Sequence, residues 1–202
     1  MIRFEDVCLS FGGKTILDNF SLEIEAGEKI LLNAPSGRGK STLIKLLLGF
    51  IRPQRGSIYY KGKKLTGESI HSIRRDIAWV NQDITLRKLK VDELLKEVGD
   101  FSANRNINFF GRLDELLEEF ALSREILHKN IDKLSGGERQ RLGLIIAILM
   151  DREVLLLDEV TSSLDAAMKR KVEEWIASTH KTVILISHDS HWNTDNFRVV
   201  RW

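Results

Sequence analysis

A short apolar run that passes through a glycine-rich turn into a helix is the feature that most restricts how this chain can fold. The run is Lys29–Leu32, the turn covers residues 34–39, and residues 40–48 have the composition of a helix that stops at Gly49. A buried strand that turns directly into a helix is the building unit of a mainly parallel sheet with helices on both faces. The segment therefore predicts an α/β core.

The remaining sequence repeats this alternation and interrupts it once. Strands are expected at residues 2–9, 20–24, 56–61, 75–81, 154–157 and 182–186, and further helices at 92–98, 113–121, 138–150 and 166–177. Between residues 83 and 133 the patterns are helical, with an asparagine-rich loop at 100–110. We expect this stretch to be a helical insertion in the α/β core.

Composition limits the classes of partner. The chain has 202 residues, a formal net charge of +2 and one cysteine, Cys8. So small a charge does not favour a nucleic acid or an anionic membrane surface, and a single cysteine excludes an intramolecular disulfide. The longest apolar run, residues 142–150, is about half of the roughly 20 residues that span a bilayer. Any work on a membrane is therefore expected to go through another polypeptide.

Residues 34–42 have the pattern of a phosphate-binding loop, in the strand–turn–helix context that such a loop needs. Glycines let backbone N–H groups turn toward phosphate oxygens, and the helix N-terminus favours anions. Lys40 is expected to reach the β- and γ-phosphates, and the Ser41 hydroxyl to bind Mg²⁺. The usual pattern G-x-x-x-x-G-K-[ST] begins with glycine, whereas this chain has Ala34, which fits if its φ is negative. The alternative is a turn that resembles the motif by chance.

A second acidic feature follows the apolar strand at residues 154–157. Asp158 and Glu159 end that strand, and ligands of α/β sheets gather at the carboxyl ends of the strands. Asp158 is expected near the phosphates, where it can organise Mg²⁺ through water, and Glu159 is placed to orient and polarise an attacking water. The alternative is an ordinary solvated strand end.

The segment Leu-Ser-Gly-Gly-Glu-Arg-Gln at residues 134–140 is the most informative of all. Ser135 and Glu138 form a capping box at the start of a helix. A cap does not explain Gly136 and Gly137, because glycine in the first turn lowers helix stability. Exposed backbone N–H groups that an anion can approach closely explain the two glycines better.

This segment resembles the signature motif of ABC ATPases, and four other positions are similar to the family's further motifs in the family's order. Gln82 resembles the glutamine of the Q-loop, residues 163–165 resemble the D-loop, His188 resembles the switch histidine, and Phe11 occupies the place of the aromatic that stacks on adenine. The resemblance covers nearly the whole chain. Val160 stands where most members have proline, and residues 120–131 are similar to short ATP-binding proteins paired with iron-export permeases.

The resemblance implies a fold and a division of the chain. The fold is a P-loop NTPase (RecA-like) α/β core with a mainly parallel sheet, an N-terminal antiparallel β subdomain and a small helical subdomain. Residues 1–202 form a single ABC ATPase domain. Residues 1–82 and 135–202 form the nucleotide-binding core with the β subdomain, and residues 83–134 form the helical subdomain.

The resemblance also implies ATP and Mg²⁺ as cofactors and assigns residues to them. The catalytic residues are Lys40, Gln82, Glu159 and His188, and the metal ligands are Ser41, Gln82 and Asp158. The residues that bind nucleotide are Phe11, Ser36, Gly37, Arg38, Gly39, Lys40, Ser41, Thr42, Ser135, Gly136, Gly137 and Asp165. In the family two subunits enclose two ATP molecules, so the signature residues Ser135, Gly136 and Gly137 act on the partner's ATP and Asp165 lies at the interface.

The implied function is an ATP-hydrolysing subunit that drives a membrane transporter through ATP-driven dimerisation. Its partners are a second copy of this chain and an integral-membrane permease on a separate chain, with no nucleic acid. The expected location is cytoplasmic, at the inner face of the cell membrane through the permease. Two alternatives are a non-transport ABC ATPase that acts in an assembly process and a nucleotide-binding module that has lost hydrolysis.

Overall fold

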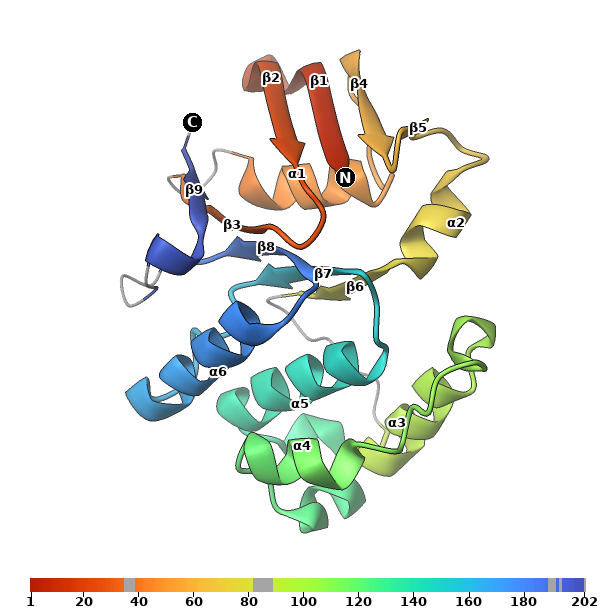
Figure 1. The fold of residues 1–202 in the computed structure, drawn as a ribbon, viewed down its shortest axis with the longest axis vertical. Coiled ribbons are helices and arrows are strands. Elements are labelled where there is room, and N and C mark those ends of the chain that lie inside the picture. The colour runs from red at the N-terminus through yellow and green to blue at the C-terminus, as the bar shows by residue number, and fades with distance from the viewer. Residues whose placement is uncertain (35–38, 82–88, 189–191, 193, 202) are drawn as a thin grey trace.

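A five-stranded parallel sheet forms the centre of the molecule. The computed structural model describes residues 1–34, 39–81, 89–188, 192 and 194–201 (Figure 1). The sheet has the order β6-β7-β8-β3-β9, and every pair of neighbours is parallel. Its strands are β3 (Lys29–Leu32), β6 (Ile77–Val80), β7 (Val154–Asp158), β8 (Thr182–Ile186) and β9 (Arg198–Val200). The predicted α/β core with a mainly parallel sheet is confirmed.

An antiparallel sheet of order β2-β1-β4-β5 covers one side of the core. Its strands are β1 (Ile2–Phe11), β2 (Lys14–Ile24), β4 (Arg55–Tyr60) and β5 (Lys63–Lys64). The strands expected at 2–9 and 20–24 are parts of one long hairpin, which turns through Gly12 and Gly13 at positive φ. Breaks in the β1–β2 register near Val7 and Leu9 explain why the sequence of this hairpin alternates only in part.

Six α-helices surround the parallel sheet in the described ranges. They are α1 (Lys40–Leu47), α2 (Ile70–Arg75), α3 (Val91–Gly99), α4 (Leu113–Glu119), α5 (Gly136–Leu149) and α6 (Ala166–Ser178). Short 3-10 turns are η1 (Ser102–Asn104), η2 (Arg124–His128), η3 (Ile131–Lys133) and η4 (Thr194–Asn196). Helix α1 lies between the two sheets, whereas α5 and α6 cover the opposite face (Figure 1). No helix of the described ranges is long and apolar enough to span a lipid bilayer.

The start of one expected strand is wrong, and the helix expected at 113–121 ends earlier, at Glu119. The strand predicted at 75–81 begins later, because Arg75 is the last residue of α2 and β6 starts at Ile77. Asp76 separates the two elements, and its backbone N–H closes the helix onto the carbonyl of Ile73. Helix α2 was not expected from the sequence, since only Ile70 and Ile73 mark its buried side.

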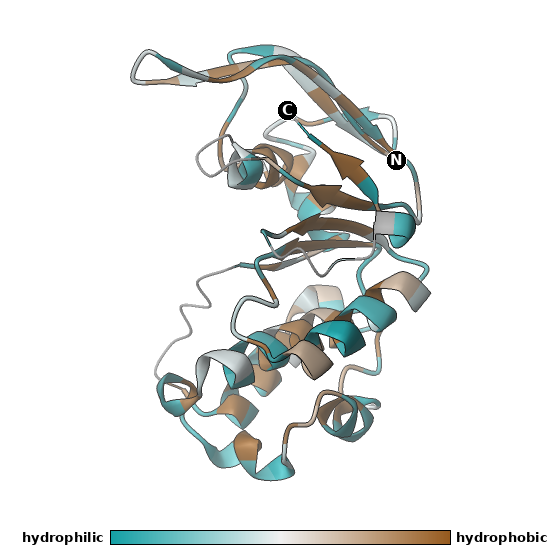
Figure 2. Cartoon of the chain, turned by 90° about the vertical axis from the view of Figure 1, so that its left-hand side faces the viewer, coloured by the Kyte–Doolittle hydropathy of each residue, from teal (hydrophilic) through white to brown (hydrophobic). Residues whose placement is uncertain are grey.

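The parallel sheet separates two hydrophobic cores. Side chains on one face, such as Ile30 and Leu156, pack with α1 and the antiparallel sheet. Side chains on the other face, such as Leu31 and Leu157, pack with α5, α6 and the helical segment. Both faces are buried, which is why β3, β7 and β8 are apolar almost throughout (Figure 2). This burial holds the carboxyl ends of the strands in fixed positions.

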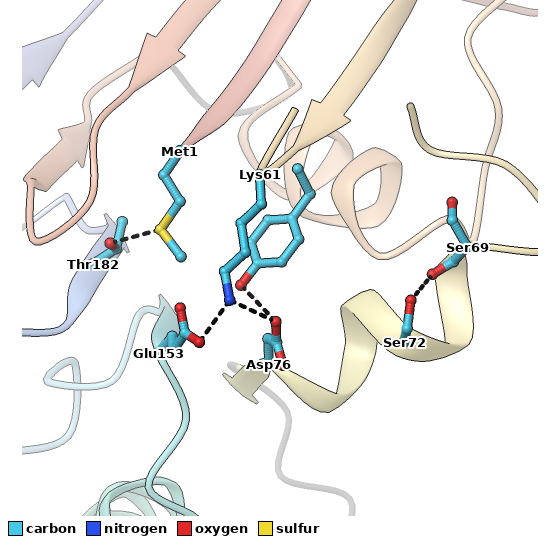
Figure 3. A network of polar contacts seen from close by, with 8 residues as sticks. Met1, Lys61, Ser69, Ser72, Asp76, Glu153 and Thr182 are labelled. Atoms are coloured by element: carbon cyan, nitrogen blue, oxygen red, sulfur yellow. Dashed lines mark hydrogen bonds and ion pairs between the residues drawn. The ribbon is translucent and has the colours of Figure 1, made fainter. Parts of the chain in front are cut away.

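A polar network joins the antiparallel sheet to the parallel core (Figure 3). Lys61 Nζ lies 3.0 Å from Asp76 Oδ2 and 2.6 Å from Glu153 Oε1, and the Tyr60 hydroxyl donates to the same Asp76 oxygen at 3.1 Å. Burial and the Asp76 carboxylate raise the pKa of Tyr60, so its hydroxyl remains a donor. We call Tyr60, Lys61, Asp76 and Glu153 the inter-sheet clamp.

A second polar contact joins the core to the helical segment. Arg152, in the connection before β7, donates to the backbone carbonyl of Ala103 at 3.1 Å and to the side-chain oxygen of Asn104. Both Arg152 and Asn104 are buried, and burial lowers the pKa of Arg152. A buried guanidinium needs such partners, because an unpaired buried charge is strongly destabilising.

Candidate functional site

The candidate site forms where three neighbouring strands of the parallel sheet end. Strand β3 leads into the predicted phosphate loop, β7 ends at Asp158, and β8 leads to Ser187 and His188. Parallel strands bring their carboxyl ends to one edge of the sheet, where α/β proteins bind ligands. Residues as far as 148 positions apart in the sequence therefore meet at this edge.

Lys40 is the central cation of this edge. It starts α1, only 7% of it is exposed, and its Nζ donates to the carbonyl of Ala34 and lies 3.0 Å from His188 Nε2. Burial lowers the pKa of Lys40, while the carboxylates of Glu159 and Asp158 oppose that effect. A partly desolvated ammonium of this kind interacts strongly with a phosphate group.

Ser41, next to this lysine in the sequence, and Asp158 provide two oxygen atoms that could bind a metal ion. The Ser41 hydroxyl donates to Asp158 Oδ2 at 3.2 Å, and Asp158 is buried. Mg²⁺ prefers oxygen ligands and is usually held by one or two protein groups together with phosphates and water. The donor set therefore fits Mg²⁺ bound together with a nucleotide.

Glu159 follows β7 in an unusual backbone conformation. Its φ is 54°, a left-handed value that costs a non-glycine residue about 1–3 kcal/mol. Its backbone N–H donates to the carbonyl of Ile186 at 2.9 Å, and Oε1 lies 3.7 Å from His188 Nε2. Strain at a polar strand end is typical of functional positions, because the fold must hold the residue there. The side chain is 12% exposed, which suits a carboxylate that acts on a bound water.

The signature segment starts helix α5 as predicted for a capping box. Ser135 Oγ accepts from the Glu138 N–H at 3.1 Å, and Glu138 Oε2 accepts from the Ser135 N–H at 2.8 Å. The latter bond and Lys129 lower the pKa of Glu138, so the box carries a negative charge. A Cβ added to Gly137 would lie 3.0 Å from the Ser163 carbonyl oxygen, and one added to Gly136 would lie 3.1 Å from Ser163 Oγ. The two glycines therefore let the chain around Ser163 approach the start of α5 closely.

Two further predicted residues, Phe11 and Asp165, lie at the end of β1 and at the start of α6. Phe11 ends β1 and is 52% exposed, so its ring is available for stacking. The hairpin that carries it packs against Gly39, because a Cβ on Gly39 would lie 2.7 Å from the Ile16 side chain. Asp165 caps α6, where its Oδ1 accepts from the Met168 N–H at 2.8 Å, so this residue has a local structural role as well.

Several predicted residues lie outside the described residues, namely Ser36, Gly37, Arg38 and Gln82. Thr42 lies in α1, and Gly39 adopts a φ of 94° as the residue before that helix. Ala34 has no positive φ, which removes the main objection to alanine at the first position of the loop. Val160 is buried in the core next to Glu159.

Sequence reasoning missed one polar residue that touches this site. Gln140 is 7% exposed, and its Nε2 donates to the Glu159 carbonyl oxygen at 3.1 Å. The available signal is its position on α5: Gln140, Leu144, Ala147 and Ile148 follow the i, i+4, i+7, i+8 spacing of one buried face. A polar side chain in such a row needs hydrogen-bond partners.

Comparison with known proteins gives consistent matches. The family model described as "ABC transporter" matches residues 17–162. The probable iron export ATP-binding protein FetA of Escherichia coli is 35% identical over 193 residues, covering 94% of this chain and 85% of that protein. The ATP-dependent lipid A-core flippase of Ralstonia nicotianae is 34% identical, covering 93% of this chain and 33% of the flippase.

Solved structures agree with the sequence matches. The dimeric ATP-binding cassette MJ0796, in a post-hydrolysis state with ADP and phosphate, superposes with a TM-score of 0.84 at 25% identity. That alignment covers 100% of this chain and 94% of the cassette. The chain spans 33 to 55% of the length of the first three curated relatives that it matches.

Proposed function

This chain belongs to the ABC transporter family of ATP-binding proteins, and on that premise we propose that it binds and hydrolyses ATP as the motor subunit of a membrane transporter. The observation that carries the proposal is the group formed by Lys40, Ser41, Asp158, Glu159 and His188 at one edge of the sheet. It contains a cation for phosphate, oxygen donors for a metal and a carboxylate for water.

In the proposed reaction a water molecule attacks the γ-phosphorus of ATP. A bond forms between the water oxygen and phosphorus, the bond to the β-phosphate oxygen breaks, and ADP leaves with the electron pair. Glu159 orients the water and accepts its proton, while Lys40 neutralises charge on the phosphates. His188, which lies 3.0 Å from Lys40 Nζ and 3.7 Å from Glu159 Oε1, is placed to contact the γ-phosphate between them.

Mg²⁺ is proposed to be held by Ser41 and Asp158, with Gln82 as a further ligand. When bound, the ion neutralises phosphate charge and fixes the geometry of the triphosphate. Ser41 Oγ and Asp158 Oδ2, which lie 3.2 Å apart, are the two oxygen atoms that would hold the ion. Phe11 is proposed to stack on the adenine ring, which its exposure permits.

The active unit is proposed to be a dimer of two copies of this chain. Helix α5 begins with two glycines whose N–H groups suit a phosphate, and the partner's ATP is their proposed ligand. The similarity to a dimeric ATP-binding cassette over the whole chain supports this arrangement. ATP then closes the dimer, and hydrolysis opens it, which provides the movement for transport.

The membrane partner is proposed to be a permease that contacts the helical subdomain, residues 83–134, from the side on which α2 and α3 lie (Figure 1). Two large apolar side chains of this subdomain are exposed, Phe101 (58%) and Phe110 (48%). Phe50, which is 55% exposed, lies beside α2, because the Arg74 guanidinium is 4.6 Å from the centre of its ring. Arg75 Nη2 donates to Ser102 Oγ at 3.3 Å, which brings the end of α2 next to the chain around Phe101. Exposed aromatic groups of this kind mark interaction surfaces. Attachment to the permease would place the chain at the inner face of the membrane.

Phosphate release by the purified chain tests the catalytic part. We expect Mg²⁺-dependent release by the wild type, and Glu159→Gln should lower the rate by about 10²–10⁴-fold, the usual effect of removing a general base. Glu174→Gln, a change at an exposed glutamate of α6, is the matched control and should leave the rate unchanged. Equal rates for Glu159→Gln and the wild type would contradict the assignment.

Sizing chromatography of Glu159→Gln tests the dimer. With ATP this variant should elute as a dimer, because the closed state forms and is not hydrolysed, and without ATP it should elute as a monomer. A monomer under both conditions would contradict ATP-driven dimerisation.

Copurification tests the proposed membrane partner. Less of a co-expressed multi-span permease should copurify from solubilised membranes with Phe50→Ser than with the wild type.

A further inference from the structure

Gln140 connects helix α5 to the segment that carries Glu159. It lies in the second turn of α5, and both ends of its amide group are used. Nε2 donates to the Glu159 carbonyl at 3.1 Å and to Ser162 Oγ at 2.7 Å, and Oε1 accepts from the Ser163 N–H at 2.9 Å. One buried side chain therefore holds three residues of the loop that follows β7.

The backbone of Glu159 is held from both sides. Its N–H bonds to Ile186 of β8, and its carbonyl oxygen accepts from Gln140 and, at 3.1 Å, from the Ser162 hydroxyl. The φ of 54° is unfavourable for glutamate, so these bonds select the conformation. Because φ and ψ set the direction of the side chain, the bond from Gln140 helps to determine where the carboxylate points.

The other end of the same loop rests on the first turn of α5. A Cβ added to Gly136 would lie 3.1 Å from Ser163 Oγ, and one added to Gly137 would lie 3.0 Å from the Ser163 carbonyl oxygen. The loop 159–163 and the start of α5 are thus in direct contact, with Gln140 bonded across them. A displacement of α5 at its N-terminus would be transmitted to Glu159 through this contact.

We propose that Gln140 is a positioning residue for ATP hydrolysis, which fixes the Glu159 carboxylate through the Glu159 backbone carbonyl and makes its position depend on the N-terminus of α5. The inference rests on the proposed function, in which the triphosphate bound by a second copy of this chain meets that N-terminus. Each chain thereby orients its own carboxylate when its helix contacts the partner's nucleotide.

Two substitutions at this position separate positioning from stability. Gln140→Met keeps the length of the side chain and removes all three hydrogen bonds. Gln140→Glu keeps an acceptor for the Ser163 N–H but presents a carboxylate oxygen to the Glu159 carbonyl. When that introduced carboxyl is protonated it has one donor and one acceptor, so it can restore the bond to the Glu159 carbonyl and keep the bond from the Ser163 N–H.

We expect both variants to lower kcat at pH 8 by at least about tenfold, with KM within about twofold of the wild type. As the pH falls, the ratio of Gln140→Glu activity to wild-type activity should rise, whereas the ratio for Gln140→Met should stay constant. Hydrogen exchange of the Ser163 amide should be faster in Gln140→Met, while the amides of the helix α5 interior stay protected. A merely structural role would not produce the pH-dependent difference.

Arg141→Met is the matched control on the same helix. Arg141 also donates to backbone carbonyls, those of Phe120, Ala121 and Gly137, and among the described residues its hydrogen bonds do not reach the loop 159–163. Its kcat should stay within about twofold of the wild type. The inference is overturned if kcat of the Gln140 variants is unchanged, or if both pH ratios are flat. Failure of the wild type to release phosphate would instead overturn the proposed function.

Discussion

The ammonium of Lys40 lies 3.0 Å from the Nε2 atom of His188, although 148 residues separate them in the sequence. Both residues are assigned to the same triphosphate. The contact places a basic ring beside a cation whose pKa is lowered by burial. In the proposed function, phosphate groups that bind beside Lys40 and His188 would change the charge around both.

The first prediction concerns the protonation of Lys40. Bound phosphates favour the charged form, so the pKa of Lys40 should be higher in the complex than in the free protein, where it is lowered. Binding of a non-hydrolysable ATP analogue should therefore take up protons, and affinity should fall as pH rises from the lowered pKa toward the pKa in the complex. Calorimetry at a series of pH values above about 8, in two buffers of different ionisation enthalpy, measures the uptake, because phosphate is fully ionised in that range.

Lys40→Arg supplies the test of this assignment. A guanidinium does not lose its proton in this range, so the uptake should disappear while a positive charge remains. Lys45→Arg, in the next turn of α1, should retain the uptake of the wild type. Equal uptake by Lys40→Arg and the wild type would assign the proton to another group.

The second prediction concerns Asp158 and the metal. Asp158→Asn removes a negative charge from the buried pair with Ser41, so the Mg²⁺ concentration for half-maximal hydrolysis should rise by about tenfold or more. The affinity for the Mg²⁺-bound analogue should fall, whereas affinity for the analogue in EDTA should change little. Asp132→Asn, an exposed change in η3, should leave both quantities unchanged. An unaltered Mg²⁺ requirement in Asp158→Asn would contradict the assignment.

The third prediction concerns the inter-sheet clamp. Lys61→Met should lower the free energy of unfolding in urea by about 1 kcal/mol or less, because the side chains of Lys61, Asp76 and Glu153 are 36–56% exposed and screened by water. The difference should shrink at high salt. Lys63→Met, on the exposed strand β5, should have no comparable effect.

The pH dependence of this clamp has a definite sign. Hydrogen bonds to Glu153 and Asp76 raise the pKa of Lys61. The stabilisation is therefore complete below the pKa of the unfolded chain and is lost as pH rises through the raised pKa of the folded chain. The difference between the wild type and Lys61→Met should be constant near neutral pH and should decrease only in alkaline solution. A difference that grows with alkaline pH would show that Lys61 acts in another way.

The parts of the fold that were predictable are those in which one segment carries the whole signal. Strands β3, β7 and β8 are buried on both faces, so their sequences are apolar almost throughout. The capping box of α5 needs only two residues close together in the sequence, Ser135 and Glu138, and it is present as expected. The carboxyl-end rule predicted that Asp158 lies near the phosphates, and the family resemblance added His188. In the structure Asp158 contacts Ser41, and His188 contacts Lys40.

The features that sequence reasoning missed depend on distant partners. Strand β9 has only three residues, Arg198–Val200, and exists because β3 offers an edge for pairing. The burial of Gln140 depends on the loop 159–163, which is about 20 residues away. Lys61 resembles any surface lysine until Asp76 and Glu153 are brought to it by two different elements.

The positive φ of Glu159 affects what laboratory selection for stability would do to this protein. Glycine and asparagine adopt that conformation with less strain, so replacement of Glu159 by either should leave stability unchanged or raise it by about 1 kcal/mol. A screen that rewards heat resistance alone would therefore favour the loss of the carboxylate. Thermostable descendants of this chain should be sequenced at position 159 before any of them is taken to have kept its turnover.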